Sequence, residues 1–345
     1  MTSISTNGQF HRIQSQNLLI QQRMTDYSEQ VSTGKQTNVY GGLTSDARQS
    51  IDLRNNVAEL ETYKKNIDTA QLRITSAAET MDRINAVARD VRDQLTKLSG
   101  NPPPDQTVVK DIAKRGYNEV AQLLNTKVEG RYIFAGSDID HPPFEDPDGF
   151  FTEIETTVKG YATAGAPQTL SDTKATALGN TYFSAALQQS PDPSPLRARV
   201  DRNLDINYQV RANGPEEPNP PTGEPSSFPE ILRNLATAAT LTYDTSNPSS
   251  FNDFQSMLTA TRTSLDTAAK SIDNNVGILG STAARIKALG TQHYETQTTL
   301  NTNIGDVEDV DMAEAISKLQ QVQTQLQASY KVTATLQKVN LIDFL

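Results

Sequence analysis

Residues 60–98 read "LETYKKNIDTAQLRITSAAETMDRINAVARDVRDQLTKL", and this stretch decides the class of fold. Within it an apolar side chain returns after every three or four residues, at Leu60, Tyr63, Ile67, Ala70, Ile74, Ala77, Met81, Ile84, Ala88, Val91, Leu95 and Leu98. This spacing is typical of one long helix with a coiled-coil-like stripe along one face. Gly100 and the prolines at 102–104 predict where the helix stops.

A second stretch with the same period lies far downstream, and it predicts a helix from about Phe251 to Gly305. Shorter helical patterns begin near Asp105 and Pro229. The helical patterns therefore flank an irregular centre on both sides. We expect a mainly α protein, in which the two halves of the chain pack as an elongated antiparallel helical rod with a small insert in the middle.

Both ends of the chain carry helical stripes of their own, separated from the long helices by Gly- and Thr-rich breaks. Two isolated helices bury too little apolar surface to offset the entropy cost of ordering them. We therefore predict that residues 1–40 and 306–345 are poorly ordered in the monomer and fold on assembly. The stripe positions form the predicted assembly interface: Ile13, Ile20, Met24, Tyr27, Val31, Ile316, Leu319, Val322, Leu326 and Leu336.

Two polar features accompany these terminal stripes. Asn17 lies on the N-terminal stripe, where a polar residue can fix the register of a helix pair at some cost in stability. The acidic run "DVEDVD" at 306–311 suits the positive end of the dipole of a new helix. We expect the last helix to begin there.

The centre of the chain has a different character. After "EGRYIFAGSDIDHPPF" at 129–144, the period changes from helical to two in "FFTEIETTV" at 150–158 and "LDINYQV" at 204–210, which predicts strands. The proline-rich "GPEEPNPPTGEPSSFP" at 214–229 predicts an extended loop. We expect five parts: an N-terminal assembly helix (1–40), a first rod half (41–129), a β-rich insert (130–228), a second rod half (229–304) and a C-terminal assembly helix (305–345).

Composition argues against several classes of function. The formal charge of −10, without a basic run, does not suit a nucleic-acid partner. No apolar run is long enough for a membrane span, and the start of the sequence lacks the apolar core of a cleaved signal peptide. The chain has no cysteine, and His11, His141 and His293 lack the spacing of a zinc protease. We expect no enzyme activity, no cofactor and no metal site.

Two segments resemble the conserved ends of the flagellin family: "YSEQVSTGKQTN" at 27–38 and "IGDVEDVDMAEAISKLQQVQTQLQASYKV" at 304–332. Within that family, "GRYIFAGSDIDHPPF" at 130–144 and "NLIDFL" at 340–345 are more similar to the hook–filament junction branch than to filament flagellins. A divergent filament flagellin stays open as the alternative.

The resemblance implies a structural subunit whose terminal helices assemble and whose central part projects outward. It implies several partners: further copies of the chain, the hook-side junction protein, flagellin, an export chaperone and the flagellar type III export apparatus. It also implies an extracellular place in the flagellum, reached without a cleaved signal peptide. Two other classes remain as alternatives, a generic coiled-coil adaptor and a glycan-binding module carried by the insert.

Overall fold

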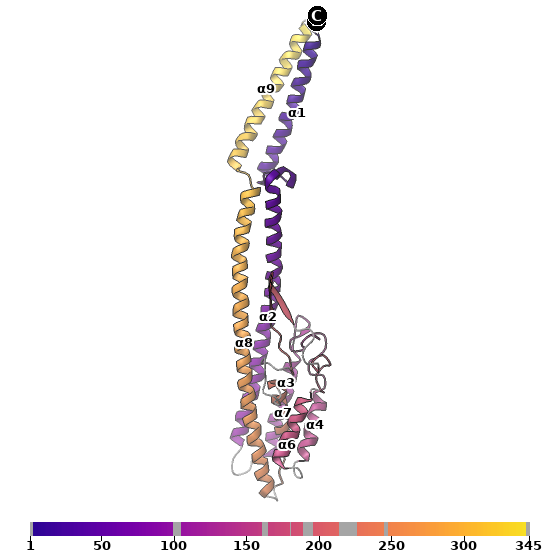
Figure 1. The fold of residues 1–345 in the computed structure, drawn as a ribbon, viewed down its shortest axis with the longest axis vertical. Helices are drawn as coiled ribbons and strands as arrows, with labels where there is room; N and C mark the ends of the chain where they lie inside the picture. The colour runs from indigo at the N-terminus through magenta and orange to yellow at the C-terminus, as the bar shows by residue number, and fades with distance from the viewer. Residues whose placement is uncertain are drawn as a thin grey trace. The chain divides into compact units, whose positions relative to one another are not determined.

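The computed structural model describes residues 3–98, 105–160, 165–179, 181–188, 196–213, 226–244 and 248–342. Within these ranges the chain forms α-helices and two small sheets, so the mainly α class is confirmed (Figure 1). The chain divides into two compact units, one of Met1–Thr62 with Gln292–Leu345 and one of Tyr63–Thr291. The long helices α2 (Ala47–Leu98) and α8 (Pro248–Glu308) each contribute residues to both units.

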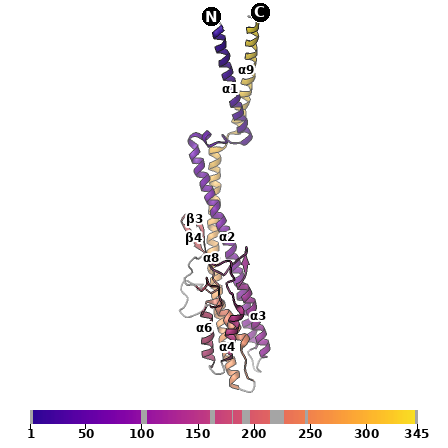
Figure 2. The same cartoon turned by 90° about the vertical axis from the view of Figure 1, so that its right-hand side faces the viewer.

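In the first unit, helices α1 (Ser3–Thr33) and α9 (Met312–Ile342) lie side by side, as both views show (Figures 1 and 2). The helices run antiparallel, because the Gly34 carbonyl accepts a hydrogen bond from the Val310 amide at 3.0 Å while Asn17 meets Ser329. A 3₁₀ helix, η1 (Tyr40–Asp46), leads into α2. The predicted break after α1 is confirmed. Gly34 has φ +71°, a left-handed conformation that favours glycine.

In the second unit, the stripe that decides the fold is buried. From Ile67 to Leu95 every predicted stripe residue of α2 is less than 5% exposed. Asp273 on α8 accepts hydrogen bonds from Asn85 and Arg89 on α2, and Asp266 on α8 pairs with Arg92. The stripe prediction is thus confirmed for α2 between Ile67 and Leu95.

Helices α3 (Gln106–Leu124) and α7 (Ser227–Thr240) complete the core of this unit. Asp105 caps α3, because its carboxylate accepts a hydrogen bond from the Thr107 amide at 2.8 Å. Helix α3 approaches α2 so closely that a Cβ at Gly116 would lie 2.7 Å from Cγ2 of Val91. All residues of α7 except the half-buried Glu230 are buried, and the helix packs against α3, α4 and α6.

The central insert contains two antiparallel sheets, each of two short strands. Strand β1 (Lys127–Val128) pairs with β2 (Arg131–Tyr132), and β3 (Arg197–Asp201) pairs with β4 (Leu204–Asn207). The strand predicted in 204–210 is confirmed over the span of β4. Helices α4 (Pro147–Lys159) and α6 (Ala166–Leu178) lie between the sheets in sequence, so the described part of the insert holds more helix than strand.

The strand predicted at 150–158 is wrong, because these residues belong to α4. Asp146 caps that helix by accepting a hydrogen bond from the Gly149 amide at 2.8 Å, and Pro147 stands in its first turn. The buried side chains follow a period of four, at Phe150, Ile154 and Val158. The helix cap and the four-residue spacing favour a helix more strongly than the weak two-residue alternation favours a strand.

The segment at 129–144 connects α3 to the insert. Glu129 (φ 52°) and Gly130 (φ 78°) form the turn of the β1–β2 hairpin. Phe134 is fully buried and its ring lies 5.3 Å from that of Phe228 on α7, while its carbonyl accepts a hydrogen bond from the Ala212 amide at 2.9 Å. The aromatic side of this segment therefore packs on the helices. Most of the proline-rich loop, residues 214–225, lies outside the described residues.

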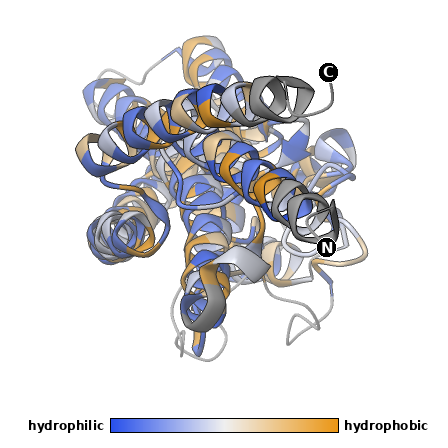
Figure 3. Ribbon diagram, turned by 90° about the horizontal axis from the view of Figure 1, so that it is seen from above, coloured by the Kyte–Doolittle hydropathy of each residue, from blue (hydrophilic) through white to orange (hydrophobic). Residues whose placement is uncertain are grey.

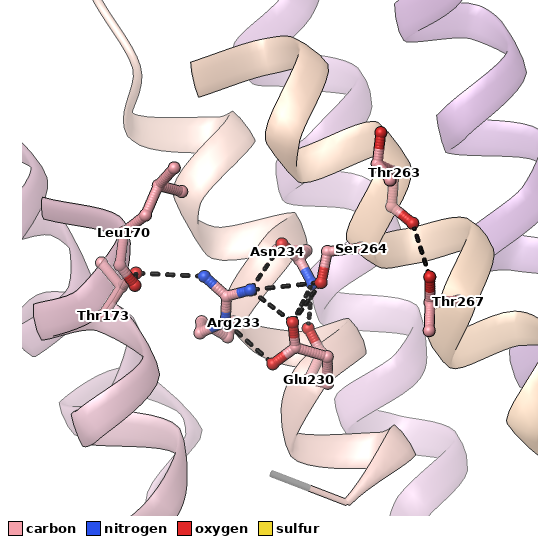
Figure 4. Close-up of polar contacts among 8 residues, drawn as sticks. All are labelled: Leu170, Thr173, Glu230, Arg233, Asn234, Thr263, Ser264 and Thr267. Carbon is pink, nitrogen blue, oxygen red and sulfur yellow. Dashed lines mark hydrogen bonds and ion pairs between the residues drawn. The ribbon is translucent and has the colours of Figure 1, made fainter. Parts of the chain in front are cut away.

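A buried polar network joins α7 to its neighbours (Figure 4). The Arg233 guanidinium is 5% exposed and donates to the Glu230 carboxylate on α7, to Thr173 Oγ1 on α6 at 3.1 Å and to Ser264 Oγ on α8 at 3.2 Å. Asn234 Nδ2 donates to the same Ser264 oxygen at 2.9 Å. Burial alone would raise the pKa of Glu230, but the hydrogen bond and charge of Arg233 hold it below the usual 4.5. One ion pair thus ties three helices together.

Candidate assembly surface

The predicted interface residues of α1 lie along its contact with α9. Each of them is half-buried, and none reaches the burial of the α2 stripe. On α9, Val322 and Leu326 are buried at 6% and 9% exposure, and Leu319 is half-buried. The helix pair therefore brings together most of the predicted positions: Ile13, Ile20, Met24, Tyr27, Val31, Leu319, Val322 and Leu326.

Two predicted positions stand apart. Ile316 is 42% exposed, because the buried positions of α9 begin at Ala315 and continue at three- and four-residue steps to Val322 and Leu326. The side chain of Leu336 lies outside the described part of the chain. The part played by all these residues in assembly stays a prediction.

Polar side chains set the register of the helix pair. Ser329 Oγ of α9 donates a hydrogen bond to Asn17 Oδ1 of α1, and Gln21 Nε2 donates to the Tyr330 hydroxyl at 2.7 Å. Asn17 thus finds its partner across the α1–α9 contact. A half-buried amide that would lose this partner if the helices slipped by one turn favours a single alignment.

Large apolar side chains remain uncovered on both terminal helices. Leu18 and Leu19 on α1 are 60% and 57% exposed, and Tyr330 and Val332 on α9 are 48% and 54% exposed. Figure 3 shows hydrophobic and hydrophilic residues alternating along both helices. Two helices alone cannot bury apolar residues that point in several directions.

Four charged side chains and one serine, which we call the charge clip, connect the two interhelical segments of this unit. It consists of Lys35, Ser50, Arg54, Glu308 and Asp309. Glu308 is only 7% exposed; its carboxylate accepts from Ser50 Oγ at 2.6 Å and from Arg54 Nε and Nη2 at 2.8 and 2.6 Å. Lys35 Nζ lies 2.6 Å from Asp309 Oδ1 and 3.4 Å from Glu308 Oε2. The bidentate arginine pair is the strong geometry for a carboxylate.

Contacts within the charge clip shift the pKa values of Glu308 and Lys35. The hydrogen bond from Arg54, followed by that from Ser50, lowers the pKa of Glu308 from 4.5 to about 2. The hydrogen bond to Asp309 raises the pKa of Lys35 above 10.5. Both groups are therefore charged across the physiological range, and the clip stays closed there.

Sequence reasoning missed the clip, because the run at 306–311 was interpreted only as the start of a helix. That role belongs to Asp311, whose carboxylate accepts from the Ala313 and Glu314 amides at 2.9 and 3.1 Å. Glu308 instead ends α8. An acidic residue at the negative end of a helix dipole is unfavourable unless cations compensate it, and this was the available signal.

Comparison with protein families matches both ends of the chain. Residues 4–138 match the model of the bacterial flagellin N-terminal helical region, and residues 263–345 match that of the bacterial flagellin C-terminal helical region. Together the two matches cover more than half of the chain and include α1, α9 and the charge clip. The chain belongs to the flagellin family.

Relatives of this flagellin-family chain carry a more specific name. The flagellar hook-associated protein 3 of Escherichia coli (strain K12) is 25% identical over 325 residues, which are 91% of this chain and 90% of the relative. A solved structure of a putative flagellar hook-associated protein from Vibrio parahaemolyticus shares the fold, with a TM-score of 0.54 and 12% identity. The match covers 76% of this chain and 97% of that one.

The described residues of this flagellin-family chain have scattered histidine and carboxylate side chains. They contain no group of three or more His, Asp or Glu side chains that could hold a metal ion, and none of their helices is apolar and long enough to cross a membrane. His293 is 7% exposed and packed in a helix. His141 lies in an exposed turn, where its hydrogen bond to Asp138 raises its pKa.

Proposed function

We propose that this chain is a structural subunit of the bacterial flagellum that links a hook-side junction protein to the filament and assembles with further copies through α1 and α9. The name of the Escherichia coli relative, hook-associated protein 3, supports the junction role over that of filament flagellin. The partners are further copies of the chain, the hook-side junction protein and flagellin.

The incomplete burial of the terminal helix pair carries this proposal. The same three-to-four spacing gives nearly complete burial on α2 but only half-burial on α1. Each apolar residue left in water forgoes about 1.5 to 3 kcal/mol of stabilisation. Neighbouring subunits would supply the missing contacts, and assembly would order the terminal segments further.

Leu326→Asp tests the role of the helix pair. Leu326 is 9% exposed. Burying a carboxylate at this position would cost several kcal/mol, so the introduced aspartate would instead force the helix contact apart to stay hydrated. We expect the variant to be exported but to leave hooks without attached filaments in electron micrographs. Gln327→Asp, one residue along on an exposed position, is the matched control and should support normal filaments. Normal filaments on cells that carry Leu326→Asp would refute the assembly role.

Deletion of the gene distinguishes a junction subunit from a filament flagellin. Loss of a junction subunit should leave complete hooks and release flagellin into the medium, because the filament has nothing to start from. Intact junctions without a filament body would instead identify the chain as the flagellin.

Export through the flagellar type III apparatus, with the help of a chaperone, is part of the same proposal. The absence of cysteine removes any need for oxidative folding outside the cell. The assembled subunit would then be extracellular. Retention of the protein inside cells that still secrete other hook components would contradict this route.

A further inference from the structure

An open groove of about 820 Å³ runs along the end of α8 and its connection to α9, within the first unit. Tyr294, 63% exposed, lies at one end of its lining in sequence, and Asp306, Asp309 and Asp311 lie at the other. No lysine or arginine is among the residues that line it. We call this feature the acidic groove.

The three carboxylates of the acidic groove make different interactions within the chain. Asp309 is paired with Lys35, and Asp311 caps α9. Asp306 is exposed near the end of α8, where the helix dipole adds to its negative potential. The groove therefore suits a ligand that is cationic at one end and can contact an aromatic ring at the other.

The same chain carries a complementary surface on α1. Arg12, Leu19 and Arg23 are all exposed. At 100° per residue they fall within about 40° of one another around the helix, on a flank beside the α9 contact. Residues 3–25 contain both arginines and no aspartate or glutamate. We call this surface the basic flank.

We propose that the basic flank of one copy docks in the acidic groove of the next copy. This inference rests on the proposed function and names the two surfaces that meet in assembly. At 1.5 Å per residue, Arg12 and Arg23 are about 16 Å apart along α1, and Tyr294 and Asp306 about 18 Å apart along α8. One arginine then pairs with Asp306, the other lies over the Tyr294 ring, and Leu19 covers the groove between them.

We expect the contact to be heterologous, so that each copy donates its flank to one neighbour and receives the flank of another. A copy that has donated its flank still has an open groove, and the contact repeats from copy to copy. A closed two-fold dimer, in which each flank occupies the groove of the other copy, would instead stop at two copies. Charge complementarity favours the flank–groove pairing in both arrangements, and the number of copies in the covalent products distinguishes them.

Disulfide cross-linking tests this contact directly, because the chain has no cysteine of its own. Leu19→Cys marks the flank and Thr302→Cys marks the groove. In concentrated, oxidised full-length protein, the double variant should form a ladder of covalent multimers, whereas each single variant should stay largely monomeric. A mixture of the two single variants should stop at covalent dimers.

Gln14→Cys combined with Thr302→Cys is the matched control, because Gln14 is exposed on the opposite side of α1 from Leu19. Arg12→Glu with Arg23→Glu should reduce the cross-linked fraction of the Leu19→Cys and Thr302→Cys double variant about tenfold, and adding Asp306→Arg should restore part of it.

Two results would overturn the inference: a double variant that remains monomeric at the highest soluble concentration, or Leu19→Cys alone cross-linking to itself as efficiently as the double variant. Failure of the proposed function is a separate outcome. It would appear as normal filaments with Leu326→Asp, whereas missing cross-links in a chain that still requires Leu326 would refute only the docking surfaces.

Discussion

Replacing Glu308 by glutamine removes the central charge of the clip while keeping its shape. A glutamine whose oxygen takes the place of Oε1 can still accept from Ser50 Oγ and Arg54 Nε. Its amide nitrogen only donates, so the charge is lost together with the hydrogen bonds from Arg54 Nη2 and Lys35 Nζ. The carboxylate is 7% exposed and its pKa is about 2 in place of 4.5. That difference corresponds to at most about 3 kcal/mol of stability at neutral pH.

The pH dependence follows from the sign of the change. Because folding lowers the pKa of Glu308, its contribution is complete above about pH 4.5 and is lost as the pH falls towards 2. Lys35 has its pKa raised and so keeps its charge throughout this window. The parent chain and Glu308→Gln should therefore differ by about 2 to 3 kcal/mol at pH 7 and converge near pH 2.

Urea unfolding followed by circular dichroism at pH 7, 4 and 2.5 measures this difference. Asp306→Asn is the matched control, because it removes an exposed carboxylate two residues away and should change stability by less than about 0.5 kcal/mol. A Glu308→Gln variant as stable as the parent chain at pH 7 would refute the ionic role of the clip. A difference that persisted unchanged at pH 2.5 would place the effect in packing instead.

Three further predictions concern the second unit, and urea unfolding measures each of them. Met81→Ala should cost about 2 to 5 kcal/mol, because Met81 is fully buried; a smaller loss would mean that the site collapses around the cavity. Arg233→Ala should cost about 3 to 5 kcal/mol by leaving Glu230 buried without its cation, and the double change of Arg233 and Glu230 to methionine should recover part of this loss. Gly277→Ala and Gly280→Ala should each stabilise α8 by up to about 1 kcal/mol, because a Cβ at either position meets open space; destabilisation would contradict the described geometry.

The long helices of the second unit could be predicted from sequence because their signal is local and repeated. The α2 stripe keeps its three-to-four period over the whole of 60–98, and each buried position supports the next. Short elements lack this redundancy. At 150–158 a few β-branched and aromatic residues fit either period, and the decisive cap, Asp146 followed by Pro147, lies just before the segment.

The charge clip shows a different limit of sequence reasoning. Glu308 and its arginine partner, Arg54, are 254 positions apart in sequence, and no local pattern links them. Helix polarity could have shown that Glu308 requires a cation, but not which one. The partner follows from the antiparallel return of the chain, which brings the start of α2 to the end of α8.

The stripes of the long helices and those of the terminal helices differ in how deeply they are buried. Periodicity predicts which face of a helix is apolar, but the residues that cover this face decide how deeply it is buried. Around α2 the chain provides α3 and α8, and the stripe is almost fully buried. Around α1 it provides α9, and Leu19 is left 57% exposed. If the terminal helices served only to hold each other together, polar residues would suit positions 18 and 19 better than leucine. The exposed Leu18 and Leu19, which lie beside the stripe, are explained if another copy covers them.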